Sequence, residues 1–307
     1  MPTAIAAKGL SRRFGSIHAV EGLTLNVPSG IVFGFLGPNG AGKTTTLHLL
    51  LGIVEPSAGS AQVAGFDVRT HPTDVRRRCG ALLEHNGLYE RLTARENLEL
   101  QARMHGLSRA ETASRTRDLL EGIGLWERRD DTLGTWSRGM KQRLAIARTL
   151  LHGPEVVFLD EPTAGFDPPA AVALREELRT LVRKEGVTVF LTTHNLPEAE
   201  AVCDQVAVLR NGRLLAVGRP GSLRGDDAPR LEVRGGPFGA RLLAGLRKRK
   251  DVAGAEVRDG ALHLTLLPKA KAAPIVEALV TAGVAVEEVR RARTSLEEDF
   301  LALVEAP

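Results

Sequence analysis

Eight residues beginning at Gly37 have the types and spacing of a phosphate-binding loop. They match the pattern G-x-x-x-x-G-K-[ST], after an expected strand at Ile31 to Leu36 and at the start of an expected helix at Thr44 to Gly52. The glycines let backbone N–H groups turn inward around phosphates, and the start of the helix adds partial positive charge. The sequence therefore predicts a nucleoside triphosphate site, in which Lys43 reaches the terminal phosphates and the Thr44 hydroxyl coordinates magnesium. The residues expected to contact the nucleotide in this loop are Gly37, Pro38, Asn39, Gly40, Ala41, Gly42, Lys43, Thr44 and Thr45.

A second segment that could do chemistry is an apolar strand that ends in two acids. Val156 to Leu159 is apolar throughout, and Asp160 and Glu161 follow it. By itself such a pair could be an acidic cap on a following helix. Beside a phosphate loop, Asp160 is expected to hold the magnesium shell, while Glu161 orients and deprotonates an attacking water. Since a general base contributes typically about 10²–10⁴-fold, Glu161 is expected to be the most costly catalytic residue to lose.

A third motif, Trp136 to Arg143, narrows the class of nucleotide-binding protein. Its sequence, WSRGMKQR, resembles the signature of ABC ATPases, which is usually written LSGGQ and is followed by a Gln-Arg pair. Ser137 and Gly139 are kept, and they would meet a γ-phosphate at a helix N-terminus. Alone, this variant could be an ordinary helix start. In register with the other two motifs, it makes residues 1 to about 220 similar to the ATP-binding subunits of ABC transporters. The departures from the signature are Trp136, Arg138 and Met140.

The resemblance implies roles for three further residues. Asp167, which ends the segment AGFD, resembles the D-loop residue of the family and is expected near bound ATP. His194 follows the expected strand Val187 to Thr193 and stands where the family has its switch histidine, although a lone histidine at such a place is more often structural. Phe14, in the segment SRRFG, matches the aromatic residue that stacks on adenine, and the alternative is a core phenylalanine.

Glu84 marks the main departure from the family. The family normally has a glutamine between the phosphate loop and the helical insertion, where it senses magnesium and the membrane subunit. No glutamine occurs here between Gln62 and Gln101, and Glu84 falls at the matching place. A carboxylate can accept a hydrogen bond from a magnesium-bound water, but it adds negative charge near the triphosphate. Glu84 is therefore a candidate catalytic and metal-shell residue, and the alternative is a plain surface glutamate.

The elements that must position these residues follow an α/β rhythm over residues 1–220. Short β-branched runs alternate with longer helical patterns, which favours a phosphate-loop ATPase domain. The largely helical stretch Ala94 to Arg129 predicts a helical insertion at about 85–145. Val206 to Leu209 and Leu214 to Val217 flank Asn211-Gly212, and this arrangement predicts a β-hairpin.

A break in the pattern separates a second domain. Turn-forming residues at 218–221 and 224–227 show no periodicity, and residues 228–307 then follow the order β-α-β-β-α-β. This order predicts a small α+β ferredoxin-like accessory domain. With Glu84 and the ending SLEEDFL, it resembles the tail of the motors of drug- and antibiotic-type ABC exporters. The expected strands are Leu231 to Val233, Ala255 to Val257, Ala261 to Leu267 and Val284 to Val289, with helices near Gly239 to Leu246, Lys271 to Ala282 and Ser295 to Val304.

The bulk composition indicates a globular protein that reaches a membrane only through a partner. The net charge of +4 arises from 41 basic and 37 acidic residues, so nucleic acid is not an expected partner. No apolar run reaches the roughly 18 residues of a membrane helix, and no signal peptide is expected. Two cysteines imply no disulfide framework and fit a reducing interior. We therefore expect a cytoplasmic protein, peripheral on the inner face of the cell membrane.

The resemblance also implies an assembly. In this family two ATPase domains face each other head to tail, and each ATP lies between the phosphate loop of one and the signature of the other. The chain has one copy of each motif, so we expect a homodimer that hydrolyses ATP with Mg²⁺ and drives a separate transmembrane permease, with export as the direction. The alternatives are the motor of an importer, or a soluble ABC ATPase acting on ribosomes or DNA. Ribosomal relatives usually carry two ATPase domains, and the DNA-repair type needs a longer coiled-coil insertion than Ala94 to Arg129.

Overall fold

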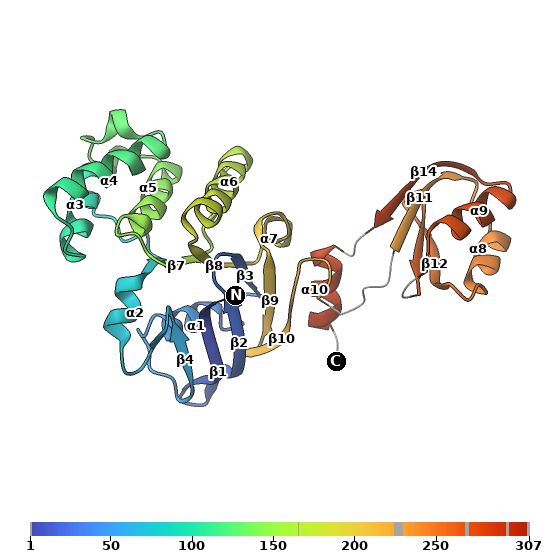
Figure 1. Ribbon diagram of the computed structural model, residues 1–307, viewed down its shortest axis with the longest axis horizontal. Coiled ribbons are helices and arrows are strands. Elements are labelled where there is room, and N and C mark those ends of the chain that lie inside the picture. The colour runs from blue at the N-terminus through green and yellow to red at the C-terminus, as the bar shows by residue number, and fades with distance from the viewer. Residues whose placement is uncertain (1, 165, 224–229, 268–269, 293–294, 306–307) are drawn as a thin grey trace. The chain divides into compact units, whose positions relative to one another are not determined.

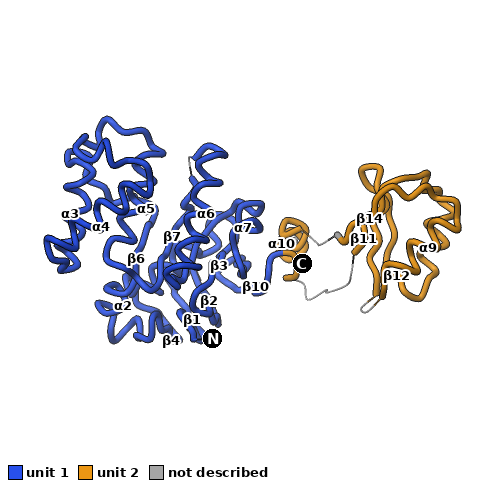
Figure 2. The backbone as a smooth tube through the Cα atoms, turned by 45° about the horizontal axis from the view of Figure 1, so that its top comes forward, with its two compact units in different colours: residues 1–220 blue, residues 221–307 orange. Residues whose placement is uncertain are grey.

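The structure is a computed structural model that describes residues 2–164, 166–223, 230–267, 270–292 and 295–305. It divides into two compact units, residues 1–220 and 221–307, which Figure 2 shows in blue and orange. Each unit is described by itself. Gly165 of the expected D-loop, and residues 224–229 at the expected break and start of the second domain, lie outside the described residues.

A six-stranded sheet forms the centre of unit 1 (Figure 1). Neighbouring strands are parallel, except that β9 and β10 form an antiparallel hairpin at one edge. Asn211 and Gly212 both have positive φ (50° and 76°), as a two-residue hairpin turn requires, so the predicted hairpin is confirmed. The apolar runs predicted as strands are confirmed, because parallel strands buried on both faces need continuous apolar sequence. In spatial order the strands are β10 (Arg213–Gly218), β9 (Gln205–Arg210), β3 (Val32–Leu36), β8 (Thr188–Thr193), β7 (Val156–Asp160) and β6 (Cys79–Leu82).

A second sheet in unit 1 has four antiparallel strands and was not expected from the sequence. Its long strands β1 and β2 change register at several points along their pairing. Such bulges interrupt the alternation of buried and exposed side chains, which is the sequence signal of a half-buried strand. The sequence pattern of unit 1 therefore gives no clear sign of this second sheet. In spatial order its strands are β2 (Ile17–Pro28), β1 (Thr3–Phe14), β4 (Ala58–Val63) and β5 (Phe66–Asp67).

Both sheets and helix α1 (Lys43–Leu50) contribute to one apolar core. Phe190 on β8 lies at its centre, with its ring 5.3–5.6 Å from the rings of Phe33, Phe35 and Phe158 on the neighbouring strands. All four rings are fully buried. The first residue of α1 is Lys43, so this packing fixes the helix that carries the phosphate loop against the central sheet.

Helices α3 (Ala94–Met104), α4 (Arg109–Gly122) and α5 (Arg138–Leu150) form a helical lobe with an apolar cluster of its own. Both α3 and α4 begin with a capping box, in which Thr93 or Ser108 exchanges hydrogen bonds with a glutamate three residues later. The predicted helical insertion is confirmed, and its last helix continues past the expected end at 145. Two 3₁₀ turns, η1 (Trp126–Arg128) and η2 (Leu133–Thr135), connect α4 to α5, and α2 (Pro72–Arg78) precedes β6.

Two helices contact the central sheet through β3: α6 (Pro168–Glu185) and α7 (Leu196–Val202). Each begins with a side-chain cap. The Asp167 carboxylate accepts a hydrogen bond from the Ala170 N–H (2.9 Å), and the Asn195 amide oxygen accepts one from the Glu198 N–H (3.2 Å). The two caps fix where the chain leaves the ends of β7 and β8.

Unit 2 is a ferredoxin-like fold, as predicted from its element order. Its four antiparallel strands have the spatial order β12-β13-β11-β14. An apolar cluster joins one face of this sheet to the two helices, whereas charged side chains occupy the other face. Its elements are β11 (Arg230–Gly236), α8 (Ala240–Arg247), β12 (Val252–Arg258), β13 (Ala261–Leu266), α9 (Ala273–Thr281), β14 (Ala285–Ala292) and α10 (Leu296–Glu305).

Two further findings concern the chain as a whole. Among the described residues, no helix is both long and apolar enough to cross a membrane. The two cysteines, Cys79 and Cys203, are free and buried. Burial raises the pKa of both thiols, that of Cys79 to about 12.

Candidate active site

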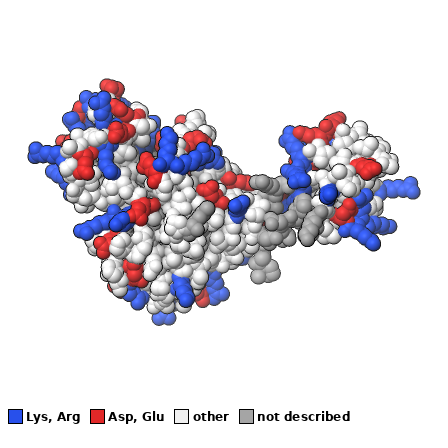
Figure 3. Space-filling model, viewed as in Figure 1, with Lys and Arg blue, Asp and Glu red and all other residues white. Residues whose placement is uncertain are grey.

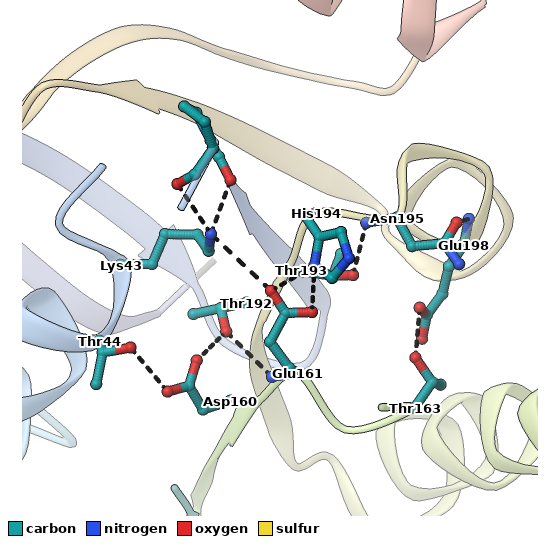
Figure 4. A network of polar contacts seen from close by, with 12 residues as sticks. Lys43, Thr44, Asp160, Glu161, Thr163, Thr192, Thr193, His194, Asn195 and Glu198 are labelled. Atoms are coloured by element: carbon teal, nitrogen blue, oxygen red, sulfur yellow. Dashed lines mark hydrogen bonds and ion pairs between the residues drawn. The ribbon is translucent and has the colours of Figure 1, made fainter. Parts of the chain in front are cut away.

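Three adjacent strands of the central sheet end at the same level. Leu36 at the end of β3 pairs with Thr193 at the end of β8, and Asp160 at the end of β7 pairs with Thr192. The segments that leave these strands therefore meet at one edge of the sheet, where open α/β folds bind their ligands. All three segments carry residues that the sequence marks as candidates (Figure 4).

The loop between β3 and α1 passes very close to neighbouring backbone. A Cβ atom at Gly37 would lie 2.5 Å from the Leu209 carbonyl oxygen, and one at Gly42 would lie 2.3 Å from the Ala19 carbonyl oxygen. Gly42 also has a φ of 105°, which side chains rarely adopt. Any side chain at these two positions would collide with neighbouring backbone, so both positions require glycine. Since α1 has no side-chain cap and no acid in its first turn, its first N–H groups are free to bind an anion.

The Lys43 side chain is folded back into the loop. Its ammonium donates to the carbonyl oxygens of Gly37 (2.7 Å) and Pro38 (3.2 Å) and lies 3.9 Å from a Glu161 carboxylate oxygen. The residue is only 7% exposed. Burial lowers the pKa of Lys43, and the carboxylates of Glu161 and Asp160 oppose that shift. The site thus holds a positive charge that two loop carbonyls and one carboxylate balance.

Asp160 and Thr44 meet at the base of the same site. The Thr44 hydroxyl donates to one oxygen of the Asp160 carboxylate (2.9 Å), and the fully buried Thr192 hydroxyl donates to the other. A hydroxyl and a carboxylate are hard oxygen ligands of the kind that Mg²⁺ prefers, with water and phosphate oxygens completing its shell. The described residues contain no cluster of three or more His, Cys, Asp or Glu that could hold a metal. The donor set therefore fits a Mg²⁺ ion bound together with a phosphate group.

Glu161 has a strained backbone and a well-oriented side chain. Its φ is +48°, a left-handed value that costs a non-glycine residue of order 1–3 kcal/mol. The Glu161 N–H donates to the carbonyl (3.1 Å) and the hydroxyl (3.2 Å) of Thr192, which holds this turn. His194 Nδ1 lies 2.9 Å from both oxygens of the Glu161 carboxylate. A carboxylate only accepts hydrogen bonds, so with Glu161 ionised the proton of neutral His194 is on Nδ1.

A buried carboxylate lies just behind this pair. Glu198 on α7 is 3% exposed, and the Thr163 hydroxyl donates to it (2.7 Å). Burial raises the pKa of Glu198, the Thr163 hydroxyl and Arg175 oppose the shift, and the charge of Glu161 adds to it. This bond joins the segment that follows Glu161 to the helix that follows His194, as Figure 4 shows.

Lys43, Thr44, Asp160 and Glu161 border a cavity of about 680 Å³. Glu84, which is exposed and follows β6, lies on its wall, as do Arg138 and Gln142 on α5. The Gln142 amide donates to the Pro162 carbonyl oxygen (3.0 Å), which connects the helical lobe to the segment after Glu161. The cavity thus combines the phosphate loop with one wall from the lobe. Its lining consists of Ile17, His18, Ala19, Asn39, Gly40, Ala41, Gly42, Lys43, Thr44, Thr45, Leu83, Glu84, Arg138, Gln142, Asp160, Glu161, Ala164 and Asn211.

Seven predicted site residues lie outside this lining. Gly37, Pro38 and His194 are hydrogen-bonded to the residues that form it, whereas the other four lie elsewhere. Ser137 is the N-cap of α5, with its hydroxyl accepting from the Met140 N–H (3.3 Å), and Gly139 follows in the first turn of that helix. Asp167 caps α6, as described above. Phe14 lies at the end of β1 with 45% of its surface exposed. The structure thus brings the phosphate loop, the acids and His194 together, and it leaves the signature residues and Asp167 at other helix starts.

Sequence reasoning missed three residues of the polar network: Thr163, Thr192 and Glu198. Thr192 is one of three threonines in β8, whose sequence is TVFLTT, and no local feature distinguishes it from the other two. Glu198 occurs in the first turn of a short helix, where a glutamate is expected from helix electrostatics alone. Their role depends on the pairing of β7 with β8, which no local pattern encodes.

Comparison with known proteins gives consistent results. Residues 20–164 match the family model described as ABC transporter. The chain is 42% identical to the daunorubicin/doxorubicin resistance ATP-binding protein DrrA of Streptomyces peucetius, over 75% of this chain and 70% of the relative. It is 39% identical to a Nod factor export ATP-binding protein I of Ralstonia nicotianae, over 78% of each chain. It is 38% identical to the daunorubicin resistance ATP-binding protein DrrA3 of Streptomyces coeruleorubidus, over 98% of this chain and 96% of the relative.

A solved structure is similar as well. It is the dimeric, post-hydrolysis state of an ATP-binding cassette bound to ADP and Pi, with a TM-score of 0.64 and 25% identity over 70% of this chain and 98% of that one.

Proposed function

Because the chain belongs to the family of ABC transporter ATP-binding proteins, we propose that it is the ATP-hydrolysing motor of an exporter whose permease is a separate chain. The observation that carries this proposal is the convergence of Lys43, Thr44, Asp160, Glu161 and His194 at the ends of three adjacent strands. Phosphoryl transfer needs positioning and charge stabilisation more than covalent chemistry. Each of these five side chains is suited to one of those tasks.

The proposed chemistry assigns each side chain a task. Lys43 leaves the carbonyl oxygens of Gly37 and Pro38 and binds the terminal phosphates, which are stronger partners for an ammonium group. Glu161 accepts a proton from the attacking water, and the Nδ1–H of His194 holds its carboxylate in place. The free N–H groups at the start of α1 bind the phosphate oxygens.

The Mg²⁺ site is proposed at Thr44 and Asp160, whose oxygens are 2.9 Å apart. When bound, the ion would neutralise charge that develops on the phosphate oxygens. Thr192 holds Asp160 from its second oxygen, so the carboxylate keeps its direction. Glu84 lies on the wall of the same cavity, and we assign it to the outer shell, where it accepts from a magnesium-bound water.

A head-to-tail homodimer would complete the site. Ser137 and Gly139 lie outside the lining of their own cavity and at the start of a helix of 13 residues, where N–H groups and a hydroxyl can bind phosphate. A second copy of the chain can bring this helix start to the ATP, and a two-fold pair closes two such sites with one surface. Asp167, at the start of α6, is assigned to the same interface, and Phe14 to the adenine ring.

Export through a separate permease rests on the relatives and on the helices of this chain. One relative is named for Nod factor export and two for daunorubicin resistance. None of the described helices could serve as a membrane span, so the pore is assigned to another polypeptide. The proposed substrates are amphiphilic drug-like or lipid-like molecules, and the proposed place of the chain is the inner face of the cell membrane.

The test uses inside-out membrane vesicles that contain the chain and the membrane protein encoded beside it. Daunorubicin is the probe, because its fluorescence is quenched when it accumulates inside vesicles. We expect uptake that depends on Mg-ATP and disappears in Glu161→Gln, whereas Glu232→Gln in unit 2 should behave as the wild type. Uptake only into right-side-out vesicles would identify an importer. An absence of ATP hydrolysis under all conditions would refute the motor function.

A further inference from the structure

The side chain of Arg12 covers one face of the Phe14 ring. Its guanidinium carbon lies 4.5 Å from the ring centroid. The two residues are two apart on β1, and a register shift between Arg12 and Arg13 interrupts the regular alternation of the strand at this point. Phe14 is nevertheless 45% exposed. The aromatic ring therefore has a cation on one face while almost half of the residue surface is open to solvent.

Arg12 is itself held in place by the segment before β4. Its Nη1 donates to the Glu55 carbonyl oxygen (2.8 Å), and its Nε is buried without a hydrogen-bond partner among the described residues. The same segment binds β1 twice more, through Ser57 N–H to the Ser11 carbonyl (2.8 Å) and Arg13 N–H to the Ser57 hydroxyl (3.1 Å). The hydrogen bond to the Glu55 carbonyl therefore holds the guanidinium over the Phe14 ring, although the unpaired Nε carries a desolvation cost.

Phe14 stands beside the phosphate cavity, although it is not part of the lining. It pairs directly with Ile17 across the tight turn at Gly15, which has a φ of 58°. Ile17, His18 and Ala19 line the cavity that contains Lys43. A nucleotide whose phosphates occupy the loop can therefore extend its base past Ile17 to the exposed side of Phe14.

We propose that Arg12 is a positioning residue for nucleotide binding, which holds the Phe14 ring so that guanidinium, ring and adenine form a three-layer stack. The inference rests on the proposed function, since it needs ATP in this cavity. Two physical effects support it. The cation draws electron density from the ring, and the ring is then a better partner for the electron-rich purine. A ring fixed before binding also loses less conformational freedom when the base arrives.

The inference predicts an effect that depends on the base and not on the phosphates. Arg12→Met keeps the length and apolar character of the side chain but removes the charged plane. It should weaken ATP binding about three- to tenfold, because a stacked base normally contributes more than that and only part of the stacking is lost. Binding of magnesium tripolyphosphate, which has no base, should remain unchanged. Arg12→Lys keeps the charge but lacks the planar group, so its affinity for ATP should lie between those of the wild type and Arg12→Met.

A double-mutant cycle tests this by isothermal titration calorimetry with ATP and with tripolyphosphate. The proteins are the wild type, Arg12→Met, Phe14→Ala and the double variant. Arg13→Met is the matched control, because this neighbouring arginine is exposed and its side chain has no partner among the described residues. Thermal denaturation checks that each variant is folded. If Arg12 acts through Phe14, Arg12→Met should have no further effect on ATP binding in the Phe14→Ala background.

Two outcomes would overturn the inference while the proposed function stands. One is an equal loss of ATP and tripolyphosphate binding in Arg12→Met. The other is a loss of ATP binding that persists in the Phe14→Ala background. Either result would make Arg12 only an anchor between β1 and the segment at 55–57. Failure of the proposed function would give a different result. The wild type would then bind neither ATP nor tripolyphosphate, and the inference would fail as well.

Discussion

The two units use charged side chains in opposite ways. At the end of the parallel sheet in unit 1, Lys43 and Glu198 are 7% and 3% exposed, and each has specific hydrogen-bond partners. On the open face of the sheet in unit 2, each of two strands carries an ion pair between residues two apart. Glu232 pairs with Arg234 on β11, and Glu288 pairs with Arg290 on β14. Both arginines of these pairs are mostly exposed. The first sheet thus has charged groups buried at its end, whereas the arginines on the second are largely in water.

The difference shows where a charge indicates function. A buried carboxylate or ammonium costs several kcal/mol of desolvation, so it persists only where its surroundings hold it for a purpose or compensate it fully. An exposed ion pair contributes about 0–1 kcal/mol and needs no such explanation. On the face that Figure 3 shows, acidic and basic side chains are interspersed over both units, as expected of solvated surface. The contrast therefore predicts large effects in unit 1 and small ones in unit 2.

The largest effect is expected at Glu161. Glu161→Gln keeps the shape of the side chain but removes the base, so steady-state ATP turnover should fall by about 10²-fold or more while ATP binding persists. ATP-bound dimers should also accumulate, because each ATP adds contacts that only the closed pair has. A coupled ATPase assay and sedimentation with Mg-ATP measure both. Turnover within about threefold of the wild type would exclude Glu161 as the base.

A smaller effect on the same reaction is expected at Thr163. Thr163→Val removes the bond to Glu198 that joins the segments after Glu161 and His194. One such hydrogen bond contributes about 1 kcal/mol, so kcat should fall about three- to tenfold, with little change in KM. Thr180→Val is the control, because among the described residues the Thr180 hydroxyl bonds only to a carbonyl within α6. Equal kcat in the two variants would mean that the Thr163–Glu198 bond does not position the site.

The stability of unit 1 should depend on pH through a half-buried histidine. The rings of His105 and His152 stack 3.8 Å apart, and His152 Nε2 lies 3.0 Å from the Cys79 carbonyl oxygen. Burial and the charges of His105 and Arg115 together lower the pKa of His152 to about 4, and the hydrogen bond to the Cys79 carbonyl opposes this shift. The unfolded chain, with the ordinary value near 6.5, then binds the proton more readily, so stability falls as the pH drops from about 6.5 towards about 4.

His152→Gln removes this proton uptake. Between about pH 7.5 and pH 5, we expect the melting temperature of the wild type to fall a few degrees more than that of the variant. His263→Gln in unit 2 is the control and should follow the wild type, because this equally half-buried histidine lies in the other unit, outside the stacked pair. If His152→Gln and the wild type lose the same number of degrees, His152 does not carry the effect.

Glu84 should have a modest effect, seen in the magnesium dependence. Its charge near the triphosphate would attract the metal and repel the phosphate, two terms of similar size that leave ATP affinity almost unchanged. Glu84→Gln should therefore preserve hydrolysis and raise the magnesium concentration for half-maximal activity about two- to threefold. ATPase titrations with magnesium measure this. Superimposable curves would make Glu84 an ordinary surface carboxylate.

The smallest effect is expected on the open face of unit 2. Glu232→Gln breaks the pair with Arg234, which is mostly exposed, and should change the free energy of unfolding by less than about 0.5 kcal/mol. Chemical denaturation measures it. A loss above about 2 kcal/mol would show that this face is as tightly organised as the active site, and the contrast between the units would fail.

Local patterns were enough to predict some of this molecule. The phosphate loop, the acids after β7 and the hairpin at Asn211-Gly212 each lie within a few consecutive residues, so their chemistry and geometry are local. The antiparallel sheet was not predictable, because bulges in β1 interrupt its alternation. Glu198 was not predictable either, since its burial depends on the packing of α7 beside the segment after β7.

The two buried thiols make the protein well suited to site-directed labelling. Maleimides and other thiol reagents attack the thiolate, and burial with a raised pKa leaves Cys79 and Cys203 almost entirely protonated and out of reach. Cysteines introduced at Met104 on the helical lobe and Ile53 after α1, which are 73% and 51% exposed, would react first. A fluorescent pair at these positions could follow the lobe against the central sheet during ATP turnover, with both native cysteines left in place.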